Sequence, residues 1–475
     1  MTTHLKTLIC AALFIVVSGC SLAPEYTRPQ LPLKDAWPQG EVYTAGEMKA
    51  DEAKDTAIPW KTYFVNPELR GTLALAIENN RDLRTACLAM EKTMALYRIQ
   101  RSEQLPTLNG VAQKSTQRIP ESLSSTGESM IGRQYDLNVG ITAYELDFFG
   151  RVKSLKEKAL EQFLATEQAR TSTQISLISR VAAAWITLAA DKEKLSLAQE
   201  IYTSQKASYT MIQQRYDVGA SSELDLRQAQ TRVEAARIDI ARYTGRVALD
   251  ENALTLLLGC HMPENLLPKD LDIVDNDPRT LIQPVCGLPS SVLLNRPDIL
   301  EAEFRLKAAN ADIGAARAAF FPRITLTGSL GAASGELNAL FDDAPVWSFV
   351  PRITLPIFTG GRNKANLKAT EVERDIAVAT YEKTIQAAFR EVADALAQGG
   401  TLEDQILAQK AFLDATAESY RLSDVRYKKG IDSYLSVLDA QRSLYAAEQA
   451  MIDTRLMKLL NRLALYKSMG GGATE

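Results

Sequence analysis

The sequence predicts a mixed α/β membrane protein that is mainly α-helical, with very long helices and four strands per chain. Three observations support this class. The frame Arg-Tyr-x-x-Gly occurs at Arg215–Gly219 and again at Arg426–Gly430, which indicates an internal repeat. Residues 152–217 almost lack glycine and proline, which is typical of one long helix. Four short segments alternate apolar and polar residues, which is typical of strands with two unlike faces.

The composition excludes several classes of function. The 475 residues carry a net charge of −4 with both signs interspersed, so the chain lacks the basic footprint of a nucleic-acid-binding protein. Its five cysteines include no C-x-x-C pair and its only histidines are His4 and His261, so we expect no metal site and no cofactor. No cluster of His, Cys or Ser meets the requirements of an active site, so we do not expect an enzyme.

The first twenty residues indicate export and lipidation. His4 and Lys6 precede an apolar run, Leu8–Val17, which is too short to span a bilayer and fits a signal peptide over residues 1–19. The run ends in Val-Ser-Gly-Cys, which resembles a bacterial lipobox and makes Cys20 the predicted lipidation site. The alternative is an ordinary signal peptide with an incidental cysteine. No later segment is apolar for long enough to form a transmembrane helix, so further insertion would require strands.

The mature chain is predicted to divide into three parts. Residues 20–60 are rich in proline and polar residues and form an extended leader. Residues 61–275 form a first structural repeat and residues 276–475 a second, each in the order helix, two strands, very long helix, turn, helix.

The predicted strands cover residues 105–119, 135–148, 323–332 and 347–355. In the second of these, alternation places one apolar set on one face: Tyr135, Leu137, Val139, Ile141 and Ala143. Tyr144 falls on the other, polar face. These strands have the length that crosses a membrane, although two soluble hairpins packed on a core would show the same pattern.

The predicted helices meet in pairs at glycines. A helix over residues 152–217 would extend about 100 Å and ends at Gly219, and a second helix follows from about residue 222 to 258. In the second repeat, helices over residues 362–429 and 433–469 meet at Gly430. Glycine adopts the left-handed conformation that ends a helix, so each glycine marks the turn of a helical hairpin.

Four strands cannot close a barrel, and open strand edges are not tolerated in lipid, so several chains would have to pool their strands. Two chains would give about eight strands and an interior filled by side chains, whereas three would give about twelve and leave a lumen.

A set of short motifs follows one order along the chain. They are Val17–Cys20, Trp60–Leu69, Tyr144–Arg151, Gly287–Ser290, Arg296–Ile299, Leu355–Phe358, Gly360–Arg362 and Leu438–Gln441. Each motif is weak alone, but this order on a duplicated frame is specific. Over nearly the whole mature chain the sequence resembles the TolC-type outer-membrane factors, specifically the lipoprotein outer-membrane channels of tripartite RND multidrug efflux systems (the NodT-type family).

The resemblance implies a TolC-like homotrimer, with a 12-stranded β-barrel in the outer membrane of a Gram-negative bacterium and a long α-helical barrel in the periplasm. The implied partners are a periplasmic adaptor (membrane fusion) protein and an inner-membrane RND transporter. The implied function is an exit duct that passively conducts drugs or other small molecules after the adaptor opens a periplasmic gate.

The resemblance places this gate at Leu435 and Asp439. The two residues are four apart and therefore share one helix face. Three copies would form an apolar ring and an acidic ring, a constriction that dewets and favours cations. Gln228 takes the place of Asp439 in the first repeat, so only the second would carry the acidic ring. The alternative is a core leucine and a solvated surface aspartate.

By the same resemblance, Asp225 and Tyr427 form a latch that joins the two hairpins in the closed state. Some relatives carry an arginine in this network where the present chain has Asp432, so the closing contact must differ here. The alternative is that Asp225 and Tyr427 are ordinary turn residues.

The resemblance also places adaptor contacts at the two hairpin tips, which consist of Val218, Gly219 and Ala220 and of Lys429, Gly430 and Ile431. The alternative is that the glycines only end helices. Cys260 and Cys286 could form a disulfide in the oxidising periplasm.

Two other functions are compatible with parts of this pattern. A TolC-like duct could serve protein secretion or metal-ion export. A lipoprotein scaffold without a pore would keep its strands soluble, and a heat-modifiable trimer that requires detergent would exclude it.

Overall fold

The computed structural model describes residues 21–30, 37–38, 40–43, 58–125, 127–271, 290–342 and 345–471. These residues belong to two compact units. The sheet unit contains residues 1–30, 89–167 and 301–381, and the hairpin unit contains residues 31–88, 168–300 and 382–475. The predicted signal peptide, Cys20 and Cys286 lie outside the described residues.

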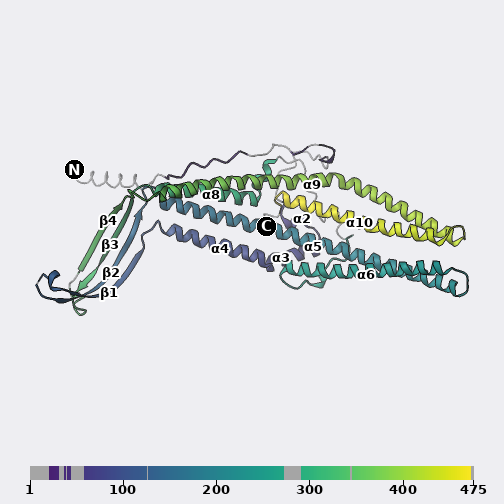
Figure 1. Ribbon diagram of the computed structural model, residues 1–475, viewed down its shortest axis with the longest axis horizontal. Helices are drawn as coiled ribbons and strands as arrows, with labels where there is room; N and C mark the ends of the chain where they lie inside the picture. The colour runs from purple at the N-terminus through teal and green to yellow at the C-terminus, as the bar shows by residue number, and fades with distance from the viewer. Residues whose placement is uncertain are drawn as a thin grey trace. The chain divides into compact units, whose positions relative to one another are not determined.

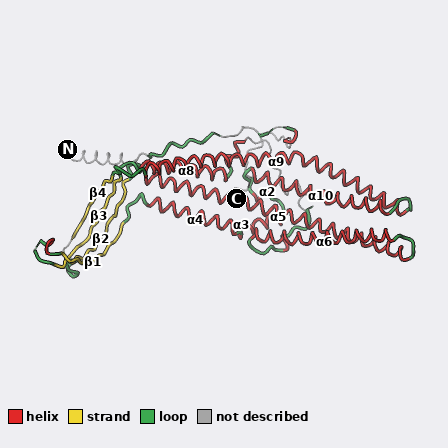
Figure 2. The backbone as a smooth tube through the Cα atoms, viewed as in Figure 1, coloured by secondary structure: helices red, strands yellow, loops and turns green. Residues whose placement is uncertain are grey.

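Both halves of the chain have the predicted order of elements, which Figure 1 labels and Figure 2 colours by type. The first half contains α2 (Trp60–Tyr63), α3 (Pro67–Asn79), α4 (Arg81–Ser102), β1 (Leu108–Ile119), β2 (Met130–Leu146), α5 (Arg151–Asp217) and α6 (Glu223–Leu258). The second contains α8 (Pro297–Ala318), β3 (Arg323–Ser334), β4 (Pro345–Thr354), α9 (Arg362–Lys428) and α10 (Tyr434–Ser468). The predicted long helices and the break between α3 and α4 are confirmed to within a few residues.

The four strands form one antiparallel sheet in the order β1-β2-β3-β4, so β1 and β4 are its edges. The register aligns the predicted apolar faces of three strands: Val139 pairs with Leu330, and Leu330 with Trp347. Paired residues share a face, so an apolar surface continues across β2, β3 and β4. β2 begins at Met130, five residues earlier than the predicted Tyr135.

A β-bulge in β2 corrects the predicted faces. Ile141 pairs with Gly328 and Tyr144 with Leu326, so two residues of β2 lie opposite Thr327 alone. Ala143 there has φ +52°, and its N–H donates to Thr327 Oγ1 at 3.1 Å. The extra residue returns Tyr144 to the apolar face, whereas uninterrupted alternation predicted the polar one.

Two glycines allow close backbone approach on the polar face of the sheet. A Cβ on Gly331 would overlap the carbonyl oxygen of Leu137, and one on Gly140 would lie 2.5 Å from that of Gly328. No side chain fits at either position without displacing a neighbouring strand.

The motif around Glu145 secures the start of α5. The Glu145 carboxylate accepts hydrogen bonds from Arg151 at 2.7 and 2.8 Å and pairs with Arg323 at 2.5 Å. Asp147 accepts a hydrogen bond from the backbone N–H of Lys153 at 2.7 Å, which satisfies a free donor in the first turn of the helix. These contacts join β2, β3 and α5 within the sheet unit.

The described start of the leader is extended and packs on α8. Asn310 and Arg317 donate to the carbonyl oxygens of Pro24 and Leu22 at 2.7 and 3.2 Å. Arg28 pairs with the buried carboxylate of Glu303 at 2.6 Å, and this interaction lowers the pKa of Glu303 against the opposing effect of burial. Further along the predicted leader, residues 41–43 form a short 3-10 helix.

The core of the hairpin unit is built on α5. Trp185 is fully buried and donates its indole N–H to the carbonyl of Leu266 at 2.9 Å. Buried Arg296 donates to the carbonyl of Ser468 at 2.6 Å and pairs with Glu391 at 2.8 Å, which explains the Arg-Pro-Asp-Ile motif. One 18-residue window of α5 has a mean hydropathy of 1.2, but 61% of it is buried, as in the core helix of a folded unit.

Candidate functional site at the two helical turns

The first turn joins α5 to α6 and is held by local hydrogen bonds. Gly219 has φ +76°, and the N–H of Ala220 donates to the carbonyl of Arg215 at 2.7 Å. Ser222 then caps α6 by accepting from the N–H of Asp225 at 3.1 Å, while the Asp225 carboxylate accepts from the N–H of Ser222 at 3.3 Å. This reciprocal capping box satisfies two donors at the helix start.

The second turn joins α9 to α10 and is held differently. Gly430 has φ +74°, and the N–H of Ile431 donates to the carbonyl of Arg426 at 3.0 Å, as in the first turn. Ser433 makes no side-chain cap on α10. Instead, the Arg426 guanidinium and the Asp432 carboxylate form two hydrogen bonds, of 2.6 and 2.9 Å, across the turn. This pair lowers the pKa of Asp432 and raises that of Arg426.

An apolar cluster joins the two hairpins just above the turns. It consists of Ile212, Leu226, Ala229, Tyr434, Val437 and Leu438, all of them buried. The rings of Tyr427 and Tyr434 lie 5.3 Å apart beside this cluster. Burial and the neighbouring Tyr427 raise the pKa of Tyr434 to about 12, so its hydroxyl stays protonated. The cluster defines which face of α10 is internal.

Leu435 and Asp439 lie on the opposite face of α10. Leu435 is 51% exposed, and Asp439 is exposed and pairs with Arg442 at 3.0 Å. In the first repeat, Leu224 and Gln228 take these places, with Leu224 66% exposed. Because Tyr434, Val437 and Leu438 occupy the buried face, the predicted gate residues are not part of the core of the chain. The alternative of a core leucine is wrong.

The predicted latch residues have different partners in this chain. The Asp225 carboxylate is occupied by the capping box and by Ser221 Oγ at 3.3 Å. The Tyr427 hydroxyl accepts a hydrogen bond from the Arg215 guanidinium at 3.1 Å. Tyr427 therefore contacts the other hairpin through the arginine of the repeated frame and not through Asp225.

The tips are open on their outer side. Val218 is 78% exposed and Ile431 58% exposed. A Cβ added to Gly219 or Gly430 would meet no heavy atom within 4 Å, but the positive φ of both residues still favours glycine. The two glycines therefore end helices, and the space around them leaves room for close approach by another molecule.

Contacts between the hairpins that sequence reasoning missed lie further from the tips. The Tyr445 hydroxyl on α10 donates to Asp239 on α6 at 3.0 Å, and Gln449 donates to the Tyr243 hydroxyl at 3.2 Å. Lys194 on α5 pairs with Asp453 on α10 at 2.5 Å. These partners lie more than 200 positions apart in the chain, so no local pattern indicates them. The capping box was missed as well, although its local signal, Ser-x-x-Asp at the start of a helix, could have indicated it.

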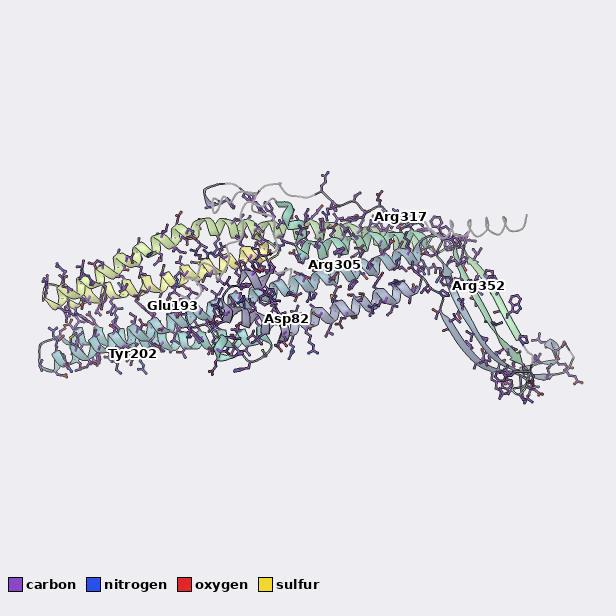
Figure 3. The ribbon with its side chains drawn as sticks, turned by 180° about the vertical axis from the view of Figure 1, so that it is seen from behind. Asp82, Glu193, Tyr202, Arg305, Arg317 and Arg352 are labelled. Carbon is purple, nitrogen blue, oxygen red and sulfur yellow. The ribbon has the colours of Figure 1, made fainter. Side chains whose placement is uncertain are left out.

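Glu193 belongs to the same region and is labelled on α5 in Figure 3. Its carboxylate accepts from Arg455 on α10 at 3.1 Å and from the backbone N–H of Leu271 at 3.0 Å.

A carboxyl pair joins α5 and α6. Asp250 lies beside buried Asp191, which has Lys194 and Arg246 each 3.9 Å away. Burial, followed by the neighbouring Asp191, raises the pKa of Asp250 to about 6. Asp250 therefore takes up its proton in the mildly acidic range.

The sheet and the two hairpins define a TolC-like outer-membrane channel fold, and comparisons with known proteins agree. The chain of the gonococcal MtrE outer-membrane channel, solved in its open state from Neisseria gonorrhoeae, is 36% identical, with a TM-score of 0.85 and coverage of 96% of this chain and 99% of that one. The CusC chain is 37% identical, with a TM-score of 0.84 and coverage of 95% and 100%.

The family described as "Outer membrane efflux protein" matches residues 72–260 and 288–471. The toluene efflux pump outer membrane protein TtgF of Pseudomonas putida is 46% identical over 476 residues, which cover 99% of this chain and 97% of that protein. Outer membrane protein OprJ of Pseudomonas aeruginosa is 42% identical over 462 residues, with coverage of 97% and 95%. The chain belongs to the outer membrane efflux protein family. It is the exit duct of an efflux pump in the outer membrane of a Gram-negative bacterium.

Proposed function

We propose that the protein forms a homotrimer that passively conducts toluene-like solvents, antibiotics or other small molecules out of the cell. Relatives at 45–47% identity are named for toluene, solvent and antibiotic efflux pumps. The sheet supports the proposal of a trimer. Its edge strands β1 and β4 have no further partner strand within one chain and would pair with the edge strands of two neighbouring copies. Its partners would be a periplasmic adaptor and an inner-membrane RND transporter, which supplies the energy.

The gate would be formed by Leu435 and Asp439. The observation that carries this assignment is the division of α10 into two faces: one is buried against α5 and α6, and the other presents these two exposed side chains. Three copies facing a common axis would place a ring of leucines beside a ring of carboxylates. Such a constriction resists wetting while it is narrow and attracts cations.

The latch would consist of Arg215 and Tyr427, with Asp225 acting through the capping box of α6. The bond from a guanidinium to a tyrosine hydroxyl is exposed, so water can replace both partners when the hairpins separate. The adaptor would contact the tips at Val218, Gly219 and Ala220 and at Lys429, Gly430 and Ile431, whose exposure leaves them accessible. We also propose that Cys20 is lipidated and that the two structural repeats cover residues 61–275 and 276–475.

Two measurements test the duct. Purified protein should have the mass of a trimer in detergent and, in planar bilayers, show a nearly closed state with rare openings. A bacterial strain lacking its own outer-membrane component should regain tolerance to toluene or antibiotics when it expresses this chain together with a compatible adaptor and transporter. A monomer without conductance would contradict the proposal, and so would tolerance that returns equally without the transporter.

A further inference from the structure

The outward face of the sheet carries a basic cluster that the duct function does not use. The continuous apolar surface of β2 ends at Tyr135, and from there on Lys114, Arg118 and Arg133 share the same face with Ile131. The register shows this directly: Lys114 pairs with Tyr135, Thr116 with Arg133, and Arg118 with Ile131. Directly paired residues share a face, so the three cations lie on the face of Leu137 and Val139 and not on the polar one.

The three cations are close neighbours. Arg133 lies diagonally between Lys114 and Arg118 on the adjacent strand, where side chains of this length reach one another. The Lys114 ammonium lies 5.3 Å from the centre of the Tyr135 ring, and Arg118 donates to Ser129 Oγ at 3.1 Å. All three side chains are exposed.

No carboxylate of the described residues forms an ion pair with this cluster. The nearest acidic residue on the strands, Asp136, lies on the opposite face of the sheet and accepts a hydrogen bond from Gln134 at 2.7 Å. Like charges at neighbouring positions of a sheet repel one another. Three such positions without a counter-charge therefore favour an external anion.

The position of the cluster indicates which anion. The loop residues 120–125, 127–129 and 335–342 lie at one end of the sheet, and the connections to α5 and α9 lie at the other (Figure 1). On β2 the apolar face runs from Tyr135 to Tyr144, roughly 30 Å along the strand, which corresponds to an apolar band of about 20–25 Å at the usual tilt of a barrel strand. The cluster begins where this band ends, at the level of lipid headgroups.

We propose that Lys114, Arg118 and Arg133 bind the phosphate groups of a phosphorylated glycolipid of the outer leaflet, with Tyr135 and Leu137 against its acyl chains. The assignment of the leaflet rests on the proposed function, because the long hairpins must lie in the periplasm for the loops to face outward. Guanidinium groups bind phosphate oxygens through paired hydrogen bonds, and the lysine adds a point charge.

A neighbouring copy of the chain does not offer a better occupant. β1 is an edge strand, and pairing with the next copy would use its backbone groups along the edge. That pairing leaves both faces of β1 and β2 uncovered, so a cluster on the face stays available to lipid.

The test compares the full-length wild type with the variant Lys114→Gln/Arg118→Gln/Arg133→Gln. Binding of bisphosphorylated lipid A to the detergent-solubilised protein is measured by native mass spectrometry, with dephosphorylated lipid A and inorganic phosphate as further probes. A control variant, Arg352→Gln/Lys364→Gln/Lys368→Gln, removes the same charge from exposed positions elsewhere in the sheet unit. One of these, Arg352, lies on the polar face of β4 and is labelled in Figure 3.

Wild type and control are expected to bind bisphosphorylated lipid A alike, and the cluster variant roughly a hundredfold more weakly, since each basic residue near an anionic lipid contributes about a factor of five. Equal binding by the cluster variant would overturn the proposal, and so would equal binding of dephosphorylated lipid A or of inorganic phosphate by the wild type. Loss of the trimer in the cluster variant would show that a neighbouring copy covers the cluster. Conductance is measured on the same samples. A cluster variant that conducts normally but no longer binds lipid A would support this lipid site. A wild type that binds lipid A but never conducts would contradict only the proposed duct function.

Discussion

The two helical turns share one sequence frame but are closed by different interactions. In the first turn, a capping box between Ser222 and Asp225 secures the start of α6, and Arg215 is free to bond the other hairpin. In the second, the homologous arginine, Arg426, folds back onto Asp432, and Ser433 makes no side-chain cap. The arginine at this position of the frame therefore bonds within its own turn in the second repeat and to the neighbouring hairpin in the first.

This difference suggests a division of roles between the hairpins. The first turn is stabilised by hydrogen bonds within a few residues, which persist whatever the rest of the molecule does. The second depends on an ion pair that solvent reaches, which contributes little to stability and can rearrange without stranding a buried group. We infer that the α9–α10 hairpin moves when the channel opens and that the α5–α6 hairpin stays in place.

The largest expected effect is on conductance, and it should distinguish the exposed residues at the start of α10 from those at the start of α6. Leu435→Ala with Asp439→Ala should raise the conductance of the reconstituted protein at least about tenfold, because it removes both rings of the proposed constriction. The matched variant Leu224→Ala with Gln228→Ala, at the same places in the first repeat, should leave conductance near that of wild type. Single-channel recording in planar bilayers measures both. A gate assignment to α10 would fail if the two variants conducted alike.

Removal of one hydroxyl tests the contact between the hairpins. Tyr427→Phe deletes the acceptor for Arg215 and should raise the open probability severalfold, since a hydrogen bond to a charged group contributes about 1.5–3 kcal/mol before its exposure is discounted. Tyr216→Phe changes the equivalent residue of the first repeat and should have no effect. Recordings in which Tyr427→Phe stays as closed as wild type would show that the contact does not hold the closed state.

The capping box predicts a local difference in stability. Ser222→Ala should destabilise the first turn of α6 by about 1 kcal/mol, and amide exchange there should become roughly fivefold faster. Ser433→Ala should leave the start of α10 unchanged, because that serine makes no cap. Hydrogen exchange with mass spectrometry resolves both segments. Comparable acceleration in the two helices would remove the distinction between the turns.

The long helices and their turns could be predicted from the sequence because they are long, periodic and bounded by glycine or proline. The bulge at Ala143 could not, because a period of two assumes an uninterrupted ladder, and only the pairing with Thr327 reveals the extra residue. The pair Arg426–Asp432 was missed because residues six apart meet only across a turn of known geometry. The proposed latch shows the limit of a resemblance: the resemblance indicated Tyr427, but the partner of the Tyr427 hydroxyl depends on where Arg215 lies.

The smallest expected effect concerns the carboxyl pair, which the second repeat lacks. Asn461 takes the place of Asp250 there. Because the pKa of Asp250 is raised from 3.8 to about 6 in the folded chain, the protonated form is favoured on folding, and this stabilisation is lost as the pH rises from about 4 through 6.

Asp250→Asn gives an uncharged side chain, like protonated Asp250, and introduces the residue that the second repeat has at this place. At pH 7.5 it should raise the melting temperature relative to wild type by about one or two degrees, a small effect because Asp250 is partly solvated. At pH 4.5 the effect should be smaller, because Asp250 is then protonated in the folded wild type. Thermal unfolding at the two pH values measures this. An advantage of the variant that is independent of pH would mean that the pKa of Asp250 is not raised in the folded chain.

The most direct test of the account asks which turn brings the copies of the chain together. Asp439→Cys and Gln228→Cys are introduced separately into a chain whose Cys87, Cys260 and Cys286 are replaced by serine, and each trimer is oxidised in its resting state. The account predicts efficient disulfide cross-links between copies through position 439 and few through position 228. Cross-links through position 228 but not through position 439 would show that the first hairpin, and not the second, forms the constriction.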